Sequence, residues 1–338
     1  MSKTHIFITG GAGCIGHYIV SALQADPNNH LHLLIRSPNK LSTNLSNKPN
    51  TTIYPYDIAD IDQVKDVLAN ADYLIHIATN WGNSSKSMVI NIDKTLQLLS
   101  YLSPNKCQKI IYFSTASILG PNNQALHQAK EFGTPYIKSK YIAYQKLQAH
   151  PLQNKIITLF PTLVFGGNTN YPSSHISSGL KSAKHWIKWL KWIWVDGTFH
   201  FIHAEDVATI TKAILSEPIK THNIVLGNQS ISVKSAMKVL CTYFNERLWF
   251  QIKCPSFILH LLAKLSQIQL NKWDKYCLKN PHFKYNTIDL KEWKITLKYP
   301  TLQKALDSTK TKAEIPDALN LETDHLEEIE YPHQRSFE

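Results

Sequence analysis

The chain has 338 residues, of which 43% are hydrophobic and 18% are charged, and its formal net charge is +11, as expected for a folded globular protein. Its five cysteines are scattered and form no C-x-x-C pair, which argues against a disulfide framework or a metal site and favours a cytoplasmic protein. No apolar stretch reaches the ~18–20 residues of a membrane-spanning helix. The first residues resemble a strand, so no signal peptide is expected.

The positive charge is unevenly distributed along the chain. Residues 314–338 hold eight acidic residues and one arginine, so the remainder is more basic than the total suggests. A basic body with an acidic tail could bind phosphorylated ligands, nucleic acid or an anionic membrane surface. A generally lysine-rich composition would give the same pattern. We expect a small-molecule substrate and no nucleic-acid partner, and the sequence leaves a homodimer open.

The most informative segment is the glycine-rich run Thr-Gly-Gly-Ala-Gly-Cys-Ile-Gly at residues 9–16, between a strand-like and a helix-like segment. A tight strand-to-helix turn needs a residue that tolerates positive φ, a pyrophosphate needs close approach to the backbone, and helix packing needs a third small residue. The helix N-terminus then offers free N–H groups to phosphates. The run predicts a dinucleotide site formed by Gly10, Gly13, Cys14, Ile15 and Gly16.

Strand-like and helix-like segments alternate through the first half of the chain. The expected strands are 5–8, 32–35, 52–54, 73–77, 110–114 and 156–160, and the expected helices are 17–25, 61–69, 88–101 and 136–149. Such alternation predicts an α/β fold whose parallel sheet is covered by helices on both faces. We therefore expect a Rossmann-type, doubly wound domain over residues 1–165.

The end of the second expected strand bears on the choice of cofactor. An acidic residue there would accept hydrogen bonds from the ribose of NAD, but this strand ends at Arg36, and Lys40 follows. Arg36 could pair with a 2′-phosphate through charge-assisted hydrogen bonds, or it could be a solvated surface arginine. The sequence favours NADP(H) and leaves NAD(H) open.

Tyr136 and Lys140 lie four residues apart and would share one face of a helix. A lysine ammonium beside a phenol stabilises the phenolate and lowers the pKa of the tyrosine. Such a phenol can exchange a proton with a substrate oxygen while a hydride moves at the adjacent carbon. Thr115 follows the preceding expected strand and could hydrogen-bond the same oxygen. The three residues together predict catalysis of hydride transfer.

The pattern changes after Pro161. A polar loop at 166–178 precedes expected helices at 182–194, 206–216, 232–245 and 255–270, with short strands at 200–203 and 223–226. We expect a smaller, mostly helical substrate-binding lobe over residues 166–307, interleaved with sheet elements that return at about 198–228. The polar, acidic residues 308–338 predict a flexible tail.

The expected helix at 182–194 is basic and rich in tryptophan. One arc holds Trp186, Trp189, Leu190, Ile193 and Trp194, and the opposite arc holds Lys181, Lys184, Lys188 and Lys191. Such a helix could make a peripheral contact with an anionic membrane surface, without stable insertion. We instead expect the tryptophans to be largely buried, or to face the substrate cleft, while the lysines face water.

With these motifs, the chain resembles the extended short-chain dehydrogenase/reductase family over roughly residues 4–230. That family includes the NAD-dependent epimerases/dehydratases, the dihydroflavonol-reductase-like enzymes and the 3β-hydroxysteroid dehydrogenases. The resemblance implies that Tyr136 is the acid/base, that Lys140 lowers its pKa and holds the nicotinamide ribose, and that Thr115 replaces the catalytic serine or threonine. It further implies that Asn91 supports the active-site backbone, Asp57 and Ile58 contact the adenine, Ala78 and Thr79 line the cofactor groove, and Pro161 packs by the nicotinamide.

Several positions depart from the family pattern. The usual arginine before the proline is Phe160, the glycine before Thr95 is Lys94, and no Asp-Glu pair follows Thr115 as in sugar 4,6-dehydratases. We expect an NAD(P)-dependent oxidoreductase that interconverts a carbonyl and a secondary alcohol. The alternatives are a nucleotide-sugar epimerase with tightly bound NAD and a non-catalytic, cofactor-binding regulatory protein.

Overall fold

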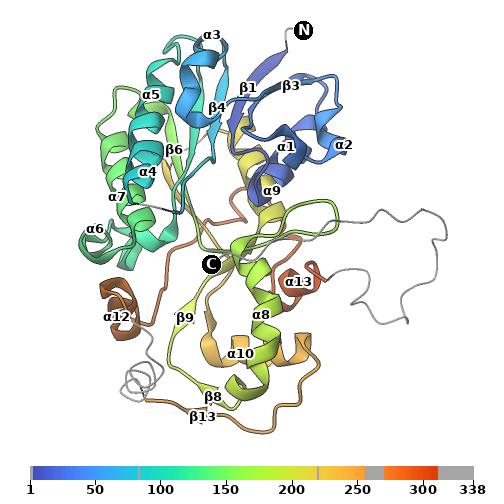
Figure 1. The fold of residues 1–338 in the computed structure, drawn as a ribbon, viewed down its shortest axis with the longest axis vertical. Helices are drawn as coiled ribbons and strands as arrows, with labels where there is room; N and C mark the ends of the chain where they lie inside the picture. Colours follow the sequence, from blue (N-terminus) through green and yellow to red (C-terminus); the bar gives the residue numbers. More distant parts are fainter. Residues whose placement is uncertain (1–2, 83, 219–220, 256–269, 311–338) are drawn as a thin grey trace, which may run out of the picture.

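The computed structural model describes residues 3–82, 84–218, 221–255 and 270–310. Most of the helix expected at 255–270 and most of the tail expected at 308–338 lie outside these residues. All five cysteines lie in the described part as free thiols. Figure 1 shows a larger lobe built around a central sheet, with a smaller lobe below it.

Within the described residues, seven strands form one parallel sheet in the order β11-β6-β5-β4-β1-β2-β3 (Figure 1). These strands are β1 (Thr4–Thr9), β2 (Asn29–Leu34), β3 (Thr51–Tyr54), β4 (Tyr73–His76), β5 (Lys109–Phe113), β6 (Ile156–Pro161) and β11 (Asn223–Leu226). The first six follow the doubly wound order 3-2-1-4-5-6, which confirms the predicted Rossmann-type α/β fold. Strand order reverses between β1 and β4, and ligands of such sheets bind at the carboxyl ends of the strands beside that point.

Side chains alternate along the strands and so build a core on each face of the sheet. On β1, Ile6 and Ile8 belong to the core that contains α1 (Cys14–Gln24) and α9 (Ala204–Ser216). Phe7 lies between them and packs into the opposite core. The remaining helices of the larger lobe are α2 (Thr43–Ser46), α3 (Lys65–Ala69), α4 (Ser84–Met88), α5 (Lys94–Ser100), α6 (His127–Phe132) and α7 (Pro135–Gln148).

The smaller lobe combines helices with short strand pairs. Its helices within the described residues are α8 (His175–Leu190), α10 (Val233–Tyr243), α12 (Lys272–Lys279) and α13 (Leu302–Asp307). The pairs are β7 (Leu163–Phe165) with β10 (Phe201–His203), β8 (Ile193–Trp194) with β13 (Ile252–Lys253), and β9 (Thr198–Phe199) with β12 (Ile231–Ser232). None of the helices in the described part of the chain combines the length and apolar character that crossing a bilayer requires.

The tryptophan-rich helix differs from the prediction in its orientation. Trp186 is 60% exposed and Trp189 is 75% exposed, so the expected burial is wrong for both, while Trp194 is partly buried. The reason is that α8 turns a different arc toward the lobe. Leu180 and Ile187, two turns apart on that arc, are its buried apolar side chains, and the tryptophans project from the other side.

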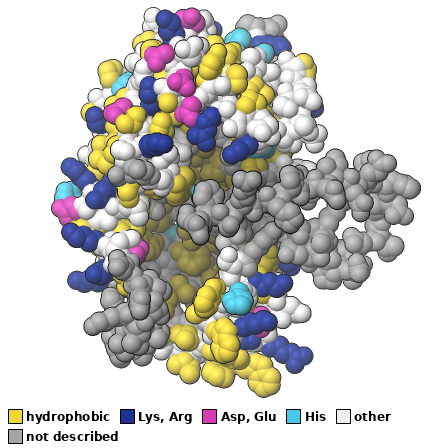
Figure 2. Space-filling view, in the orientation of Figure 1, with side chains coloured by type: hydrophobic (Ala, Val, Ile, Leu, Met, Phe, Trp, Pro, Cys, Tyr) yellow, Lys and Arg dark blue, Asp and Glu magenta, His cyan; other side chains and the backbone are white. Residues whose placement is uncertain are grey.

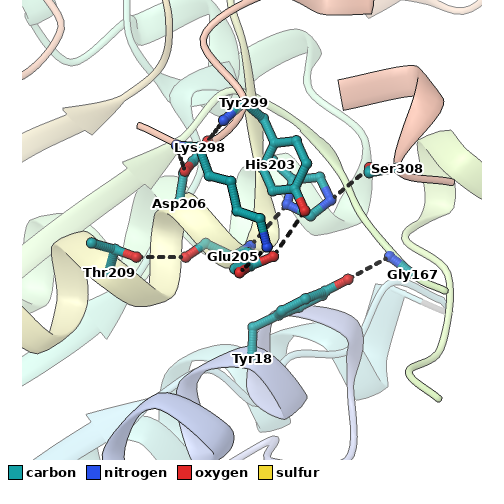
Figure 3. Close-up of polar contacts among 9 residues, drawn as sticks. All are labelled: Tyr18, Gly167, His203, Glu205, Asp206, Thr209, Lys298, Tyr299 and Ser308. Carbon is teal, nitrogen blue, oxygen red and sulfur yellow. Dashed lines mark hydrogen bonds and ion pairs between the residues drawn. The ribbon is translucent and has the colours of Figure 1, made fainter. Parts of the chain in front are cut away.

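A buried polar junction ties the segment 298–308 to α9 (Figure 3). Asp206, only 1% exposed, accepts hydrogen bonds from the backbone N–H groups of Lys298 (2.8 Å) and Tyr299 (3.1 Å). His203 accepts from Glu205 N at the start of α9, and its other ring nitrogen lies 3.0 Å from the Ser308 hydroxyl. Burial lowers the pKa of His203 to about 4, so this ring is neutral near pH 7.

Asp206→Ala is expected to lower the free energy of unfolding by about 2 kcal/mol, because two backbone N–H groups lose their acceptor. Urea denaturation followed by circular dichroism measures the change. Asp60→Ala removes an exposed carboxylate and should stay within about 0.5 kcal/mol of wild type. Equal stabilities of the two variants would contradict the importance of this junction.

Candidate active site

The glycine-rich loop adopts the conformation that a dinucleotide requires. Gly10 has φ +77°, and a Cβ there would lie 2.7 Å from the backbone nitrogen of Ala78 at the end of β4. A Cβ on Gly16 would lie 2.2 Å from the carbonyl oxygen of Gly10, so α1 packs tightly against the loop. Gly13 is the N-cap of α1 and supplies no side-chain cap. The N–H groups of the first turn are therefore available to an anion.

A large cleft of about 1460 Å³ opens at the carboxyl ends of the strands. Its lining includes every residue that the sequence assigned to the cofactor or to catalysis except Asn91. The buried hydroxyl of Ser114 also lines the cleft and has no hydrogen-bond partner among the described residues. An unsatisfied donor in this position, together with the glycine cradle, fits a dinucleotide along the sheet edge.

Arg36 and Asp57, which the sequence places at the adenosine end of the cofactor, form an ion pair with each other. Arg36 Nη1 lies 3.1 Å from Asp57 Oδ2, and the Arg36 side chain is 74% exposed. Asp57 also caps the 3₁₀ turn that begins at Ile58 by accepting a hydrogen bond from Ala59 N. The guanidinium therefore lies at the rim of the cleft, where it can reach a ligand without crossing buried surface.

Asn91 does not line the cleft but braces two elements that do. It lies in a π-helical turn, Val89–Asp93, inside the helix expected at 88–101. Its carbonyl oxygen accepts hydrogen bonds from Asn80 N (2.8 Å) and the Thr79 hydroxyl (3.0 Å). Its amide donates to Asn80 O (3.0 Å) and to the hydroxyl of Ser139 on α7 (2.8 Å). The loop after β4 is thereby fixed against the helix that carries Tyr136.

Tyr136 lies in the first turn of α7, which begins with a Thr134 cap and Pro135. The residue is 7% exposed and its side chain is hydrogen-bonded to that of Thr115. Burial raises the pKa of Tyr136 above its usual range, and the hydrogen bond with Thr115 opposes part of this shift. The sequence predicted that Lys140 lowers the pKa of Tyr136, but in this structure burial has the largest effect on that pKa and raises it.

Lys140 lies one turn further along α7 and is 2% exposed. Its ammonium donates to the carbonyl oxygen of Phe113 at the end of β5 (2.7 Å) and lies 4.8 Å from the ring centroid of Tyr112. Burial lowers the pKa of Lys140 to about 7. A lysine that is only partly charged near neutral pH stabilises a nearby phenolate less than a fully charged one.

The sequence analysis missed Trp81, which covers the proposed catalytic phenol. Its ring stacks on Tyr136 with centroids 3.8 Å apart and planes inclined by 17°. The ring of His175, the first residue of α8, also lies near Trp81, with the two ring centroids 5.0 Å apart. Trp81 is 56% exposed, so it separates the phenol from solvent. A large aromatic residue in the polar loop after the fourth strand was the available signal.

The two histidines at 200 and 203 have structural partners. His200 bonds the carbonyl oxygen of Asn228 through one ring nitrogen, and its other ring nitrogen accepts from Tyr285 N. Among the described residues, no three His, Cys, Asp or Glu side chains are grouped closely enough to hold a metal ion.

Several solved structures share this fold at low sequence identity. UDP-N-acetylglucosamine 4-epimerase from Methanobrevibacter ruminantium, with UDP-N-acetylmuramic acid, is 18% identical with a TM-score of 0.64, over 91% of this chain and 97% of that chain. UDP-glucose 4-epimerase from Thermotoga maritima, with UDP-glucose, is 16% identical with a TM-score of 0.63, over 90% and 97%. dTDP-glucose 4,6-dehydratase from Bacillus anthracis, with NAD, is 15% identical with a TM-score of 0.62, over 90% and 95%.

Comparison with curated protein sequences gives no match. A family model described as the NAD dependent epimerase/dehydratase family matches residues 6–227, about two thirds of the chain. The matched region contains the glycine-rich loop together with Thr115, Tyr136 and Lys140. The chain therefore belongs to the NAD-dependent epimerase/dehydratase family, a group of NAD-dependent enzymes among the extended short-chain dehydrogenases/reductases.

Proposed function

We propose that this protein is an NAD(P)-dependent oxidoreductase that interconverts a carbonyl and a secondary alcohol by hydride transfer, with Tyr136 as the acid/base. One arrangement carries the proposal. The phenol of Tyr136, hydrogen-bonded to Thr115, lines the same cleft as the glycine-rich loop. A dinucleotide held by that loop and a substrate oxygen at the phenol would therefore meet in one cleft.

When bound, the nicotinamide supplies the hydride in reduction or accepts it in oxidation. Tyr136 donates its proton to the carbonyl oxygen as negative charge develops there, and the Thr115 hydroxyl hydrogen-bonds the same oxygen. The raised pKa keeps Tyr136 protonated near pH 7, which is the form that reduction requires. Lys140 would orient the ribose, and Asn91 holds the surrounding backbone in place.

The surroundings of Tyr136 favour an apolar substrate. Trp81 and Trp273 line this part of the cleft, and Trp273 packs in the same core as Tyr136. Phe160 stands where the family usually has an arginine, and it packs edge-on against Tyr144. Aromatic walls bind alicyclic or aromatic ketones through apolar contact. A nucleoside diphosphate would need cationic partners. Apart from Arg36, Lys40 and Lys140, which lie on the proposed cofactor side, the described lining of the cleft offers Lys86.

A nucleotide-sugar epimerase is the second candidate. The observation that favours it is the fold that this chain shares with two UDP-sugar 4-epimerases. The similarity covers most of this chain and most of each epimerase. An epimerase returns its hydride within each turnover, whereas a reductase consumes reduced cofactor stoichiometrically. Net oxidation of the cofactor distinguishes the two.

We also propose that residues 1–165, with the segment at 198–228, bind the cofactor, and that residues 166–307 form the substrate side. The lining of the cleft supports this division, because it includes Pro172–Ile176 and Trp273 from the second half of the chain.

Tyr136→Phe is expected to lower turnover by ~10²–10⁴-fold, because the ring remains while the transferable proton is lost. The assay follows NADPH oxidation with a panel of aromatic and alicyclic ketones, and cofactor titration should give nearly unchanged affinity. Tyr141→Phe, on the same helix, is the matched control and should retain activity.

Near-native rates in the Tyr136→Phe variant would refute the mechanism. Conversion of UDP-sugars without net cofactor oxidation would establish the epimerase instead. Cofactor binding with no turnover of either substrate class would favour the non-catalytic alternative.

Trp81→Ala is expected to lower kcat/KM about tenfold, because it exposes Tyr136 to water and removes an aromatic contact for the substrate. Trp81→Phe keeps an aromatic ring and should retain most of the activity. The exposed Trp249 provides a matched control, since Trp249→Ala lies outside the cleft lining. Equal kcat/KM values for the two alanine variants would rule out a role for Trp81.

We further propose that NADP(H) is preferred over NAD(H), since Arg36 lies at the rim of the cleft with its guanidinium exposed. Arg36→Asp should weaken NADPH binding by about tenfold or more, the value of one charge-assisted hydrogen bond, and should improve NADH binding. Fluorescence titration with both cofactors measures the change. Lys48→Asp introduces the same charge change at another exposed position and should leave the preference unaltered. Tighter binding of NADH than NADPH by the wild type would overturn this assignment.

A further inference from the structure

Seven large apolar side chains are exposed together at the far end of the smaller lobe, and we call this group the aromatic tip. Its members are Trp186 (60%), Trp189 (75%), Leu190 (50%), Ile193 (39%), Trp249 (80%), Phe250 (58%) and Ile252 (64%). Figure 2 shows hydrophobic side chains gathered at this lower end of the molecule, with lysine and arginine side chains beside them. Soluble monomers rarely expose a contiguous apolar surface of this kind without a binding role.

The tip is formed by two chain segments that are firmly joined. Ile252 pairs with Ile193 and Lys253 with Trp194 in the strand pair β8–β13. The backbone of Ile252 donates to Trp192 O at 2.8 Å, and that of Cys254 donates to Trp194 O at 2.8 Å. The rings of Trp192 and Phe250 lie 4.9 Å apart between centroids. The exposed side chains are therefore held on one fixed surface.

Helix α8, which carries three of the seven side chains of the tip, is anchored from another side. Ile187 is 4% exposed, and Lys191 is 9% exposed and bonds Glu246 at 2.9 Å. Trp189 and Leu190 follow Trp186 by three and four residues on α8, so the three share an arc that faces away from this anchor. Nothing in the packing of α8 requires tryptophan on that arc.

The charges around the tip are strongly positive. Residues 184–196 and 233–254 together hold seven lysines and arginines and two acidic residues. Both acids are already ion-paired, Glu246 with Lys191 and Asp196 with Lys253. Lys184 and Lys188 are exposed on α8, and Lys234 and Arg247 are exposed on the segment 233–254. The tip thus combines aromatic side chains with cations that the local acids do not neutralise.

We propose that the aromatic tip docks this protein onto the surface of an anionic lipid bilayer. Tryptophan favours the bilayer interface, where its ring is apolar and its N–H can remain hydrated. Exposed lysines beside it are attracted to anionic headgroups, each strengthening binding by about fivefold before screening. Lysine is depleted in protein–protein interfaces, so this composition fits lipid better than a second copy of the chain. The cleft is lined by the first turn of α8 at His175, whereas the tip lies at its last turn.

Co-sedimentation of the full chain with vesicles tests the proposal. We expect binding to vesicles of phosphatidylcholine mixed with phosphatidylglycerol at low ionic strength, with at least tenfold weaker binding to phosphatidylcholine alone and at high salt. Trp189→Ser combined with Trp249→Ser should weaken binding at least tenfold, and so should Lys184→Glu combined with Lys188→Glu. Lys146→Glu combined with Lys212→Glu applies the same charge change to exposed positions on α7 and α9 and should retain binding.

Circular dichroism and thermal unfolding establish that each variant is folded. As a second readout, brominated phosphatidylcholine in the anionic vesicles should quench the tryptophan fluorescence of the wild type and not that of the double tryptophan variant. Absence of binding to anionic vesicles would overturn the proposal, as would equal binding by the tryptophan variant. A concentration-dependent dimer that the tryptophan substitutions dissociate, without vesicle binding, would assign the tip to a second copy of the chain.

Discussion

The close approach of two backbones at the centre of the sheet is the constraint on which the site depends. Gly10 turns with positive φ directly against Ala78, so the loop after β1 and the end of β4 lie in contact. A side chain at Gly10 would force them apart. Because Thr79 and Asn80 follow Ala78, the same contact fixes the loop after β4 that Asn91 holds. Asn91 in turn bonds Ser139 on α7, the helix of Tyr136. The glycine-rich loop and the proposed acid/base thus belong to one connected unit.

Burial acts in opposite directions on the two titratable groups of α7. It raises the pKa of Tyr136 and lowers that of Lys140, because in each case the charged form loses hydration. The phenol therefore remains protonated near pH 7, and the ammonium is easier to deprotonate than in water. Trp81 contributes to this environment by stacking on the exposed side of Tyr136. Exclusion of water is therefore the common cause of both pKa shifts.

The helix α8 joins two surfaces with different characters. Its first residue, His175, lies beside Trp81 at the cleft, and its last turn carries Trp189 at the aromatic tip. Its buried residues Leu180 and Ile187 secure it to the smaller lobe between these ends. The helix that lines the cleft at its first residue therefore exposes large apolar side chains at its other end.

The sequence by itself determined the elements whose signals are local. The spacing of Gly10, Gly13 and Gly16 and the alternation of apolar runs were enough to predict the doubly wound sheet, since both follow from backbone geometry and side-chain periodicity. Only the tertiary structure decided which way the arcs of α8 face, because an apolar arc has the same period whether it packs on a core or meets another partner. Likewise, Trp81 and Tyr136 lie 55 positions apart in the chain, and the pKa directions of Tyr136 and Lys140 depend on burial. Contacts and burial of this kind arise only when distant segments pack together, so no local pattern encodes them.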